Sequence, residues 1–258
     1  MSNKTALITG ASSGIGYEFA RLLAQEGYDL VLVARSAERL AEVAREVATA
    51  HSIKAEFVAL DLSQPEAPAQ LFAEVKARGL SVDLLVNNAG FGDLSLFANC
   101  DWELQRQMIQ VNVTTLAQLT RVFLPEMVQR KSGRILNVGS TGSFAPVPYM
   151  AIYAATKAFV LSFSEALFAE LQGTGVTVTA LCPGVTKTKF FARAKSEGMF
   201  LKKLNEMDAR DVARIGYRAL MKGKARVVPG WFNKIMIASM RLITRDLALW
   251  TSKRMMQP

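Results

Sequence analysis

Three side chains that can bind or transfer a proton lie close together in the second half of the chain. Tyr153 and Lys157 are four residues apart, and Ser140 precedes the tyrosine by thirteen. Residues at i and i+4 share one face of a helix, so an ammonium group would lie beside the phenol. An unperturbed phenol, with a pKa of about 10, is a poor acid at neutral pH, and a nearby cation lowers that pKa. The group predicts proton delivery to a substrate oxygen that Ser140 holds.

A glycine-rich turn stands near the N-terminus. It directly follows the apolar run 6–8 and opens an amphipathic stretch. Glycine allows a positive φ and a close approach of the backbone to a phosphate, and the N-terminus of the next helix attracts negative charge. We therefore expect a dinucleotide pyrophosphate at this turn. The residues predicted to bind it are Gly10, Ser12, Ser13, Gly14, Ile15 and Gly16.

Seven short apolar runs alternate with amphipathic stretches along the chain. Near-continuous hydrophobicity is typical of parallel strands covered on both faces, and the stretches between them predict helices. Right-handed crossovers then give one α/β domain, a Rossmann-type doubly wound parallel sheet of about seven strands with helices on both faces. The predicted strands lie in residues 6–8, 30–33, 57–60, 84–86, 135–138, 176–181 and 226–228, and the clearest helices in 17–25, 37–50, 102–130 and 152–171.

The order of the motifs is as informative as the motifs themselves. With the spacing Gly-x-x-x-Gly-x-Gly at its start, the chain resembles the short-chain dehydrogenase/reductase family over residues 4 to 190. The run 153–159, the single-domain length and a basic apolar tail resemble the branch that contains ketoacyl-thioester and hydroxysteroid reductases. The resemblance is carried by Thr9 to Gly16, Asn87 to Gly90, Asn112, Ser140, Tyr153 with Lys157, and the run from Pro183 to Thr188.

The resemblance implies roles for these residues. Asn112, Ser140, Tyr153 and Lys157 would form a catalytic tetrad, in which Asn112 holds a water that connects Lys157 to solvent. Asp61 matches the position that contacts adenine, and it is equally suited to capping its own loop. The remaining implied cofactor contacts are Leu62, Asn88, Ala89, Gly90, Pro183, Gly184, Thr186 and Thr188, together with Tyr153 and Lys157.

The end of the second predicted strand indicates which cofactor is used. Where the family's NAD-binding members carry an acidic residue for the ribose 2′-hydroxyl, this chain has Ala34, Arg35 and Ser36. A guanidinium offers a planar fork suited to a 2′-phosphate, and Arg39 follows one turn later. We expect NADP(H), the alternative being that Arg35 is a solvated surface charge.

These features predict an NADPH-dependent oxidoreductase that reduces a lipophilic ketone or aldehyde, free or linked as a thioester. Two alternatives stay open: an NADP-dependent hydroxysteroid or hydroxyacyl dehydrogenase in the oxidative direction, and a non-catalytic NADP-sensing or membrane-associated protein. The only histidine, His51, is expected at the surface, so we expect no metal site. The basic segments lack a nucleic-acid recognition motif, and no nucleic-acid partner is expected.

The net charge of +9 is concentrated in two segments. Residues 187–205 hold six cations against Glu197, in a lid that we expect over the substrate from about 186 to 205. Residues 231–258, which follow the predicted domain 1–230, hold five cations against Asp246 and form a basic amphipathic tail. Its apolar face requires a cover, for which the protein's own body, a second subunit and an anionic bilayer are the candidates.

The surroundings of the protein are indicated more indirectly. Two cysteines, Cys100 and Cys182, lack disulfide or zinc spacing and are expected in the core, and Met1 leads into a strand without a signal peptide. We expect a cytoplasmic protein, with peripheral membrane contact through its tail. By resemblance, the helices that start near Trp102 and Ile152 would pair copies into a dimer or tetramer.

Overall fold

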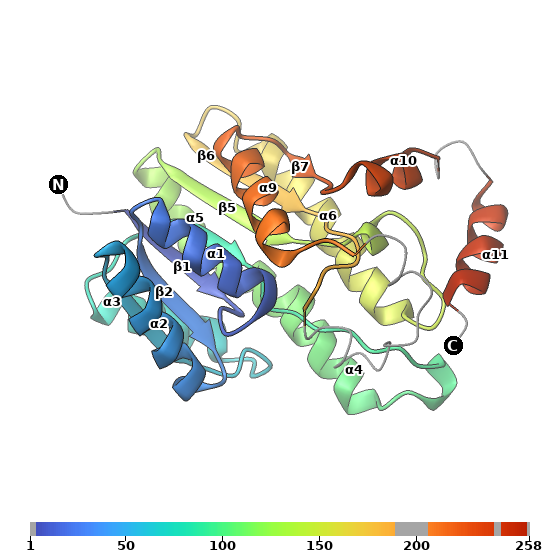
Figure 1. The fold of residues 1–258 in the computed structure, drawn as a ribbon, viewed down its shortest axis with the longest axis horizontal. Coiled ribbons are helices and arrows are strands. Elements are labelled where there is room, and N and C mark those ends of the chain that lie inside the picture. Colours follow the sequence, from blue (N-terminus) through green and yellow to red (C-terminus); the bar gives the residue numbers. More distant parts are fainter. Residues whose placement is uncertain (1–3, 189–205, 240–243, 257–258) are drawn as a thin grey trace.

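The computed structural model describes residues 4–188, 206–239 and 244–256. Seven strands form one parallel sheet in the order β3-β2-β1-β4-β5-β6-β7, with helices on both faces (Figure 1), which confirms the predicted fold. The chain first builds outward from β1 to β3 and then crosses to β4 on the other side of β1, so the strand order reverses there. The strands are β1 (Thr5–Thr9), β2 (Asp29–Ala34), β3 (Ala55–Ala59), β4 (Val82–Asn87), β5 (Gly133–Val138), β6 (Val176–Leu181) and β7 (Arg226–Val227).

Both faces of the sheet are apolar because successive side chains of a strand point to opposite sides. In β1, Ile8 packs in a cluster with Phe19 and Leu40, whereas its neighbour Leu7 packs with Phe123 in the opposite layer. All five side chains are almost completely buried. The first layer contains α1 (Gly14–Gln25), α2 (Ala37–His51) and α9 (Ala209–Met221), and the second contains α3 (Ala67–Ala77), α4 (Trp102–Ile109), α5 (Leu116–Gln129) and α6 (Ala151–Glu170).

The long helix predicted over residues 102–130 is not regular. Between α4 and α5 the chain forms a π-helical segment, η2 (Gln110–Thr115), which contains Asn112. A π turn is rare and often marks a functional position, because the extra residue per turn redirects a side chain. Here it accompanies a fully buried asparagine. The apolar periodicity of residues 102–130 did not indicate this interruption.

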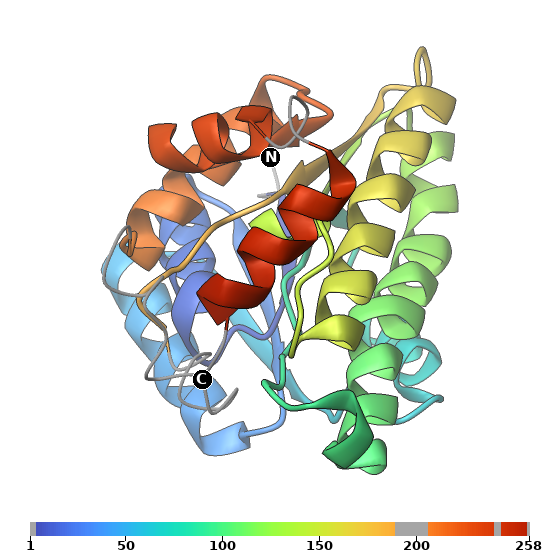
Figure 2. The same cartoon turned by 90° about the vertical axis from the view of Figure 1, so that its right-hand side faces the viewer.

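The predicted tail forms two helices, α10 (Trp231–Ser239) and α11 (Arg245–Met256). α10 buries Asn233 and Ile237, and the Ser252 hydroxyl of α11 donates a hydrogen bond of 3.3 Å to the carbonyl oxygen of Pro146. Both helices and α4 lie at the same end of the molecule, where Figure 2 views them directly. The tail therefore packs, at least in part, against the body of the protein.

Some smaller expectations are also resolved. His51 is exposed at the end of α2, as predicted. Cys182 is buried, but Cys100 is only partly buried, so the expectation of a core position is wrong for that residue. Among the described helices, only α6 is long and apolar enough to match a membrane span by length and composition. Because a helix that packs on a sheet, as α6 does on β6, can pass the same test, this match assigns no span.

Candidate active site

A cleft of about 1010 Å³ opens at the carboxyl ends of the strands. It is lined by the segments that follow β1, β2, β4, β5 and β6, which is where doubly wound sheets bind their ligands. Of the predicted site residues, only Gly16 and Asn112 do not line it. The structure brings together Gly10, Ser12, Ser13, Gly14, Ile15, Arg35, Ser36, Asp61, Leu62, Asn88, Ala89, Gly90, Ser140, Tyr153, Lys157, Pro183, Gly184, Thr186 and Thr188.

The glycine-rich turn has the backbone that a phosphate site requires. Gly10 and Gly14 have φ values of 68° and 58°, a region that side chains with a Cβ rarely adopt. The N-cap residue Ser13 makes no side-chain hydrogen bond to the first turn of α1, which also lacks acidic residues. The N-terminal amides are therefore available to an anion. Gly16 serves packing, because a Cβ there would lie 2.3 Å from the Gly10 carbonyl oxygen.

Asn88 fixes the position of this turn from the neighbouring strand β4. Its Nδ2 donates to the carbonyl oxygen of Thr9 at 2.9 Å, and its backbone N–H donates to the Thr9 hydroxyl at 3.0 Å. A Cβ at Gly10 would lie 2.7 Å from the same Nδ2. The side chain predicted as a cofactor contact is thus already used to connect β1 with β4.

Two arginines follow β2, and they have different roles. Arg39 donates from Nε to the Ser12 carbonyl oxygen at 3.3 Å and forms an ion pair with Glu42, so it holds the glycine-rich turn. Arg35 is exposed and lines the cleft, and in the described part of the chain it has no ion pair or hydrogen bond. Ser36 caps α2 by accepting from the Arg39 backbone N–H. Arg35 is the cation available to a phosphate.

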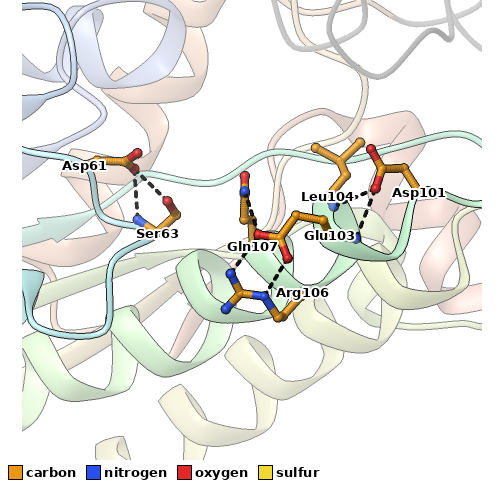
Figure 3. A network of polar contacts seen from close by, with 7 residues as sticks. All are labelled: Asp61, Ser63, Asp101, Glu103, Leu104, Arg106 and Gln107. Carbon is orange, nitrogen blue, oxygen red and sulfur yellow. Dashed lines mark hydrogen bonds and ion pairs between the residues drawn. The ribbon is translucent and has the colours of Figure 1, made fainter.

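Asp61 caps its own loop, which is the second of the two roles expected for it. Its Oδ1 accepts hydrogen bonds from the backbone N–H and the hydroxyl of Ser63, at 3.0 and 2.9 Å (Figure 3). It also lines the cleft. Farther along in Figure 3, Gln107 of α4, another lining residue, donates to Glu103, which also pairs with Arg106. These contacts fix the cleft wall beside the expected adenosine end.

Ser140, Tyr153 and Lys157 meet in the cleft from two elements. Ser140 follows β5, where its Oγ accepts from the Gly142 backbone N–H at 3.0 Å and forms a side-chain hydrogen bond with Tyr153. Tyr153 and Lys157 lie on α6, with the lysine Nζ 5.9 Å from the tyrosine ring centroid. The ammonium donates to the Val138 carbonyl oxygen at 2.7 Å. The three side chains thus line the same cleft, with Ser140 and Tyr153 joined by a hydrogen bond.

Burial controls the protonation of this group. It raises the pKa of Tyr153 to about 12, while the hydrogen bond with Ser140 lowers it in part. Burial also lowers the pKa of Lys157 to about 8, because the charged form loses its hydration. The expected lowering of the Tyr153 pKa by the lysine is therefore wrong for the protein alone. Burial is the largest cause of the rise in the Tyr153 pKa, and the Lys157 ammonium donates its hydrogen bond to the Val138 carbonyl oxygen.

Asn112 lies behind the site rather than in it. Its Nδ2 donates to the Phe91 carbonyl oxygen at 3.0 Å and to the Thr156 hydroxyl at 3.1 Å, and its Oδ1 accepts from the Phe91 backbone N–H. A Cβ at Gly90 would lie 2.9 Å from that Oδ1 and 3.3 Å from the Lys157 Nζ. The amide thus joins the loop after β4 to α6, the helix that carries Lys157.

Some lining residues are not among the predicted site residues. Phe232 and Met236 of α10 form a wall of the cleft, and Met150 lines both this cleft and a second cavity of about 340 Å³. Met150 packs on Tyr149 and Tyr153, so it separates the two spaces. A periodic apolar pattern could have indicated α10 as a helix, but not which of its faces meets the cleft.

Comparisons with known proteins agree with this geometry. A family model for short chain dehydrogenases matches residues 4–198. The very-long-chain 3-oxoacyl-CoA reductase-A of Danio rerio is 35% identical over 197 residues, covering 72% of this chain and 59% of the relative, so the chain spans about three fifths of that protein. A short-chain dehydrogenase from Sphingobium yanoikuyae, solved in complex with NADPH, is 32% identical with a TM-score of 0.82, covering 93% of this chain and 94% of that one.

A solved 7beta-hydroxysteroid dehydrogenase is 26% identical, with a TM-score of 0.87 and coverage of 99% of this chain and 97% of the other. The predicted resemblance to ketoacyl and hydroxysteroid reductases is thereby confirmed, and NADPH complexes among such structures support a nicotinamide dinucleotide as the cofactor. The matched model covers most of the chain and contains Ser140, Tyr153 and Lys157. The chain is therefore an oxidoreductase that belongs to the short chain dehydrogenase family.

Proposed function

We propose that the protein reduces a lipophilic ketone to an alcohol with NADPH. The observation that carries this proposal is the meeting of Ser140, Tyr153 and Lys157 in the cleft. Arg35, an exposed cation at the other end of the same cleft, supports the phosphorylated cofactor. Because cells generally keep that cofactor reduced, it also favours the reductive direction.

The side chains divide the reaction as follows. When bound, the reduced nicotinamide supplies a hydride, which the carbonyl carbon accepts. Ser140 holds the carbonyl oxygen, and Tyr153 donates its phenolic proton to that oxygen, so the product is the neutral alcohol. Burial disfavours the phenolate left behind, since it raises the pKa of Tyr153 to about 12.

The substrate class follows from the cleft wall. The lining includes Val147 and Met150 before α6, which pack with Tyr153, and Phe232 and Met236 on α10. These apolar side chains favour a hydrocarbon chain or ring system over a sugar or a small hydroxy acid. Since the relative from Danio rerio is a 3-oxoacyl-CoA reductase, we propose a 3-oxoacyl thioester or a bulky cyclic ketone as the substrate.

Turnover measurements test this proposal directly. NADPH consumption is followed spectroscopically with 3-oxoacyl thioesters, steroid ketones, quinones and small aldehydes, using purified Tyr153→Phe as the blank. We expect turnover with the lipophilic ketones and a loss of about 10²- to 10⁴-fold in the variant, the usual contribution of a general acid. NADPH binding, measured by fluorescence, should be retained. Undiminished turnover by Tyr153→Phe would refute the assignment.

A further inference from the structure

Six large apolar side chains are exposed at the end of the molecule where α4, α10 and α11 lie. Each has between 54% and 74% of its surface exposed to solvent. This fraction is high for side chains that usually avoid water, and an apolar surface of this kind often marks an interaction site. We call these residues the apolar rim: Leu96, Phe97, Trp102, Trp231, Ile235 and Trp250.

The apolar rim adjoins the mouth of the cleft. On α10, the rim residues Trp231 and Ile235 alternate in sequence with Phe232 and Met236, which line the cleft. On α11, Trp250 is close in sequence to the lining residue Ser252. Figure 2 faces this end of the molecule, with α10 above α11 and α4 below. A ligand leaving the cleft past these helices would pass between rim side chains.

The rim residues at and before the start of α4 lie close to both cavities. Leu96 and Phe97, which precede α4, line the second cavity together with Lys253 of α11. Trp102, the first residue of α4, is two residues before Leu104, which lines the main cleft. The three elements therefore present their apolar side chains around the two cavities.

Cations accompany the rim on the tail helices. Lys234, Lys253 and Arg254 are exposed, and the Arg254 guanidinium lies 4.2 Å from the Trp250 ring centroid. The acidic groups of the same elements are largely engaged. Asp101 caps the N-terminus of α4, and Glu103 forms an ion pair with Arg106. Asp246 of α11 is the exposed exception among the described tail residues.

We propose that the apolar rim docks the protein on the surface of an anionic lipid bilayer. Tryptophan and aliphatic side chains enter the region between headgroups and acyl chains, while lysine and arginine bind the anionic headgroups. A second copy of the chain fits less well, because a twofold contact through this surface would bring like charges together. The docked cleft would face the layer in which lipophilic molecules concentrate.

Vesicle flotation of the full-length protein tests this inference without any turnover, so its outcome is independent of the proposed reaction. Phosphatidylcholine vesicles with and without about one third phosphatidylglycerol are compared for the wild type, Trp231→Ser/Ile235→Ser and Lys234→Glu. We expect binding to the anionic vesicles and weakening of that binding by salt. The partition coefficient should decrease about tenfold for each of the two variants, which we call the rim variants although Lys234 adjoins the rim. None of these three residues lines the cleft.

The pair Met221 and Lys222, an exposed methionine beside an exposed lysine at the end of α9, provides the matched control. Met221→Ser and Lys222→Glu should bind vesicles like the wild type, and circular dichroism should show the same fold for all variants. Absence of wild-type binding, or equal losses in rim and control variants, overturns the proposal. So does a mass by light scattering that falls from dimer to monomer only in the rim variants, since the rim would then join two copies.

Discussion

Gly184 and Asn233 are in direct contact, although 49 positions separate them in the chain. A Cβ at Gly184 would lie 2.6 Å from the Asn233 Nδ2 and 2.7 Å from its Oδ1. The amide is 5% exposed and donates to the Pro229 carbonyl oxygen at 2.8 Å. The loop after β6 thus packs directly against α10. Through this contact, the cofactor side of the cleft positions Phe232 and Met236 on its substrate side.

Replacing Gly184 with alanine should disturb the contact between this loop and α10. Overpacking a buried contact costs about 1 to 3 kcal/mol, and a displaced α10 should raise KM for bulky ketones more than for small ones. Chemical unfolding and kinetics with a bulky and a small ketone measure the two effects. Gly184→Ala/Asn233→Ser should recover part of the stability, because the shorter side chain relieves the clash. Gly142→Ala is the steric control, since its Cβ would lie 3.5 Å from the Ser140 Oγ and 3.6 Å from the Val147 Cγ2, which are ordinary contact distances.

Lys157 should make the cofactor-free protein less stable at neutral pH than an apolar residue in its place would. Burial lowers its pKa from 10.5 to about 8, so between these values the unfolded chain binds more protons, and stability rises with pH. A shift of this size corresponds to roughly 3 kcal/mol. Lys157→Met should therefore be more stable than the wild type at pH 7, and the difference should close above pH 10.

Urea unfolding of both proteins between pH 7 and pH 10.5 measures that difference. The exposed Lys222→Met is the control for removing a lysine that lies outside the core. The loss of the 2.7 Å hydrogen bond to the Val138 carbonyl oxygen reduces the gain at pH 7 but leaves its pH dependence unchanged. A constant gap for Lys157→Met across this range would contradict the proposed burial effect.

Arg35 should decide between the two nicotinamide dinucleotides. A hydrogen bond to a charged group contributes about 1.5 to 3 kcal/mol, so Arg35→Asp should weaken NADPH binding by roughly 10- to 100-fold. NADH binding should change little or improve, because the new carboxylate can accept from a ribose hydroxyl. Dissociation constants for both cofactors provide the measurement, with Arg45→Asp on the outer face of α2 as the control. Equal losses of affinity for both cofactors in Arg35→Asp would contradict the prediction that Arg35 selects NADPH.

Met150 should limit the length of the substrate. It separates the main cleft from the second cavity, so Met150→Ala should connect the two spaces and raise kcat/KM for long ketones relative to short ones by about tenfold. Kinetics with a homologous series of ketones would show the change. Met127→Ala, at a fully buried methionine of α5 that lines neither cavity, should lose stability without a change in length preference.

The sequence alone determined the sheet and the location of the chemistry. Apolar runs such as 30–33 and 135–138 are buried on both faces only in a parallel sheet between two helical layers, so their alternation with helices indicated the fold. The i, i+4 spacing of Tyr153 and Lys157 fixed their common face, and Gly10 and Gly14 marked the turn that requires positive φ. These properties depend on residues that are close in the sequence, so the sequence pattern is sufficient to predict them.

The tertiary structure decided what depends on contacts between distant segments. The engagement of Asn88 with Thr9, the contact of Asn233 with Gly184 and the position of Met150 between two cavities all join parts of the chain that the sequence separates widely. Burial, which sets the pKa values of Tyr153 and Lys157, is likewise a property of everything packed around them. Periodicity shows that a side chain is apolar or polar, but only packing shows which neighbour it meets.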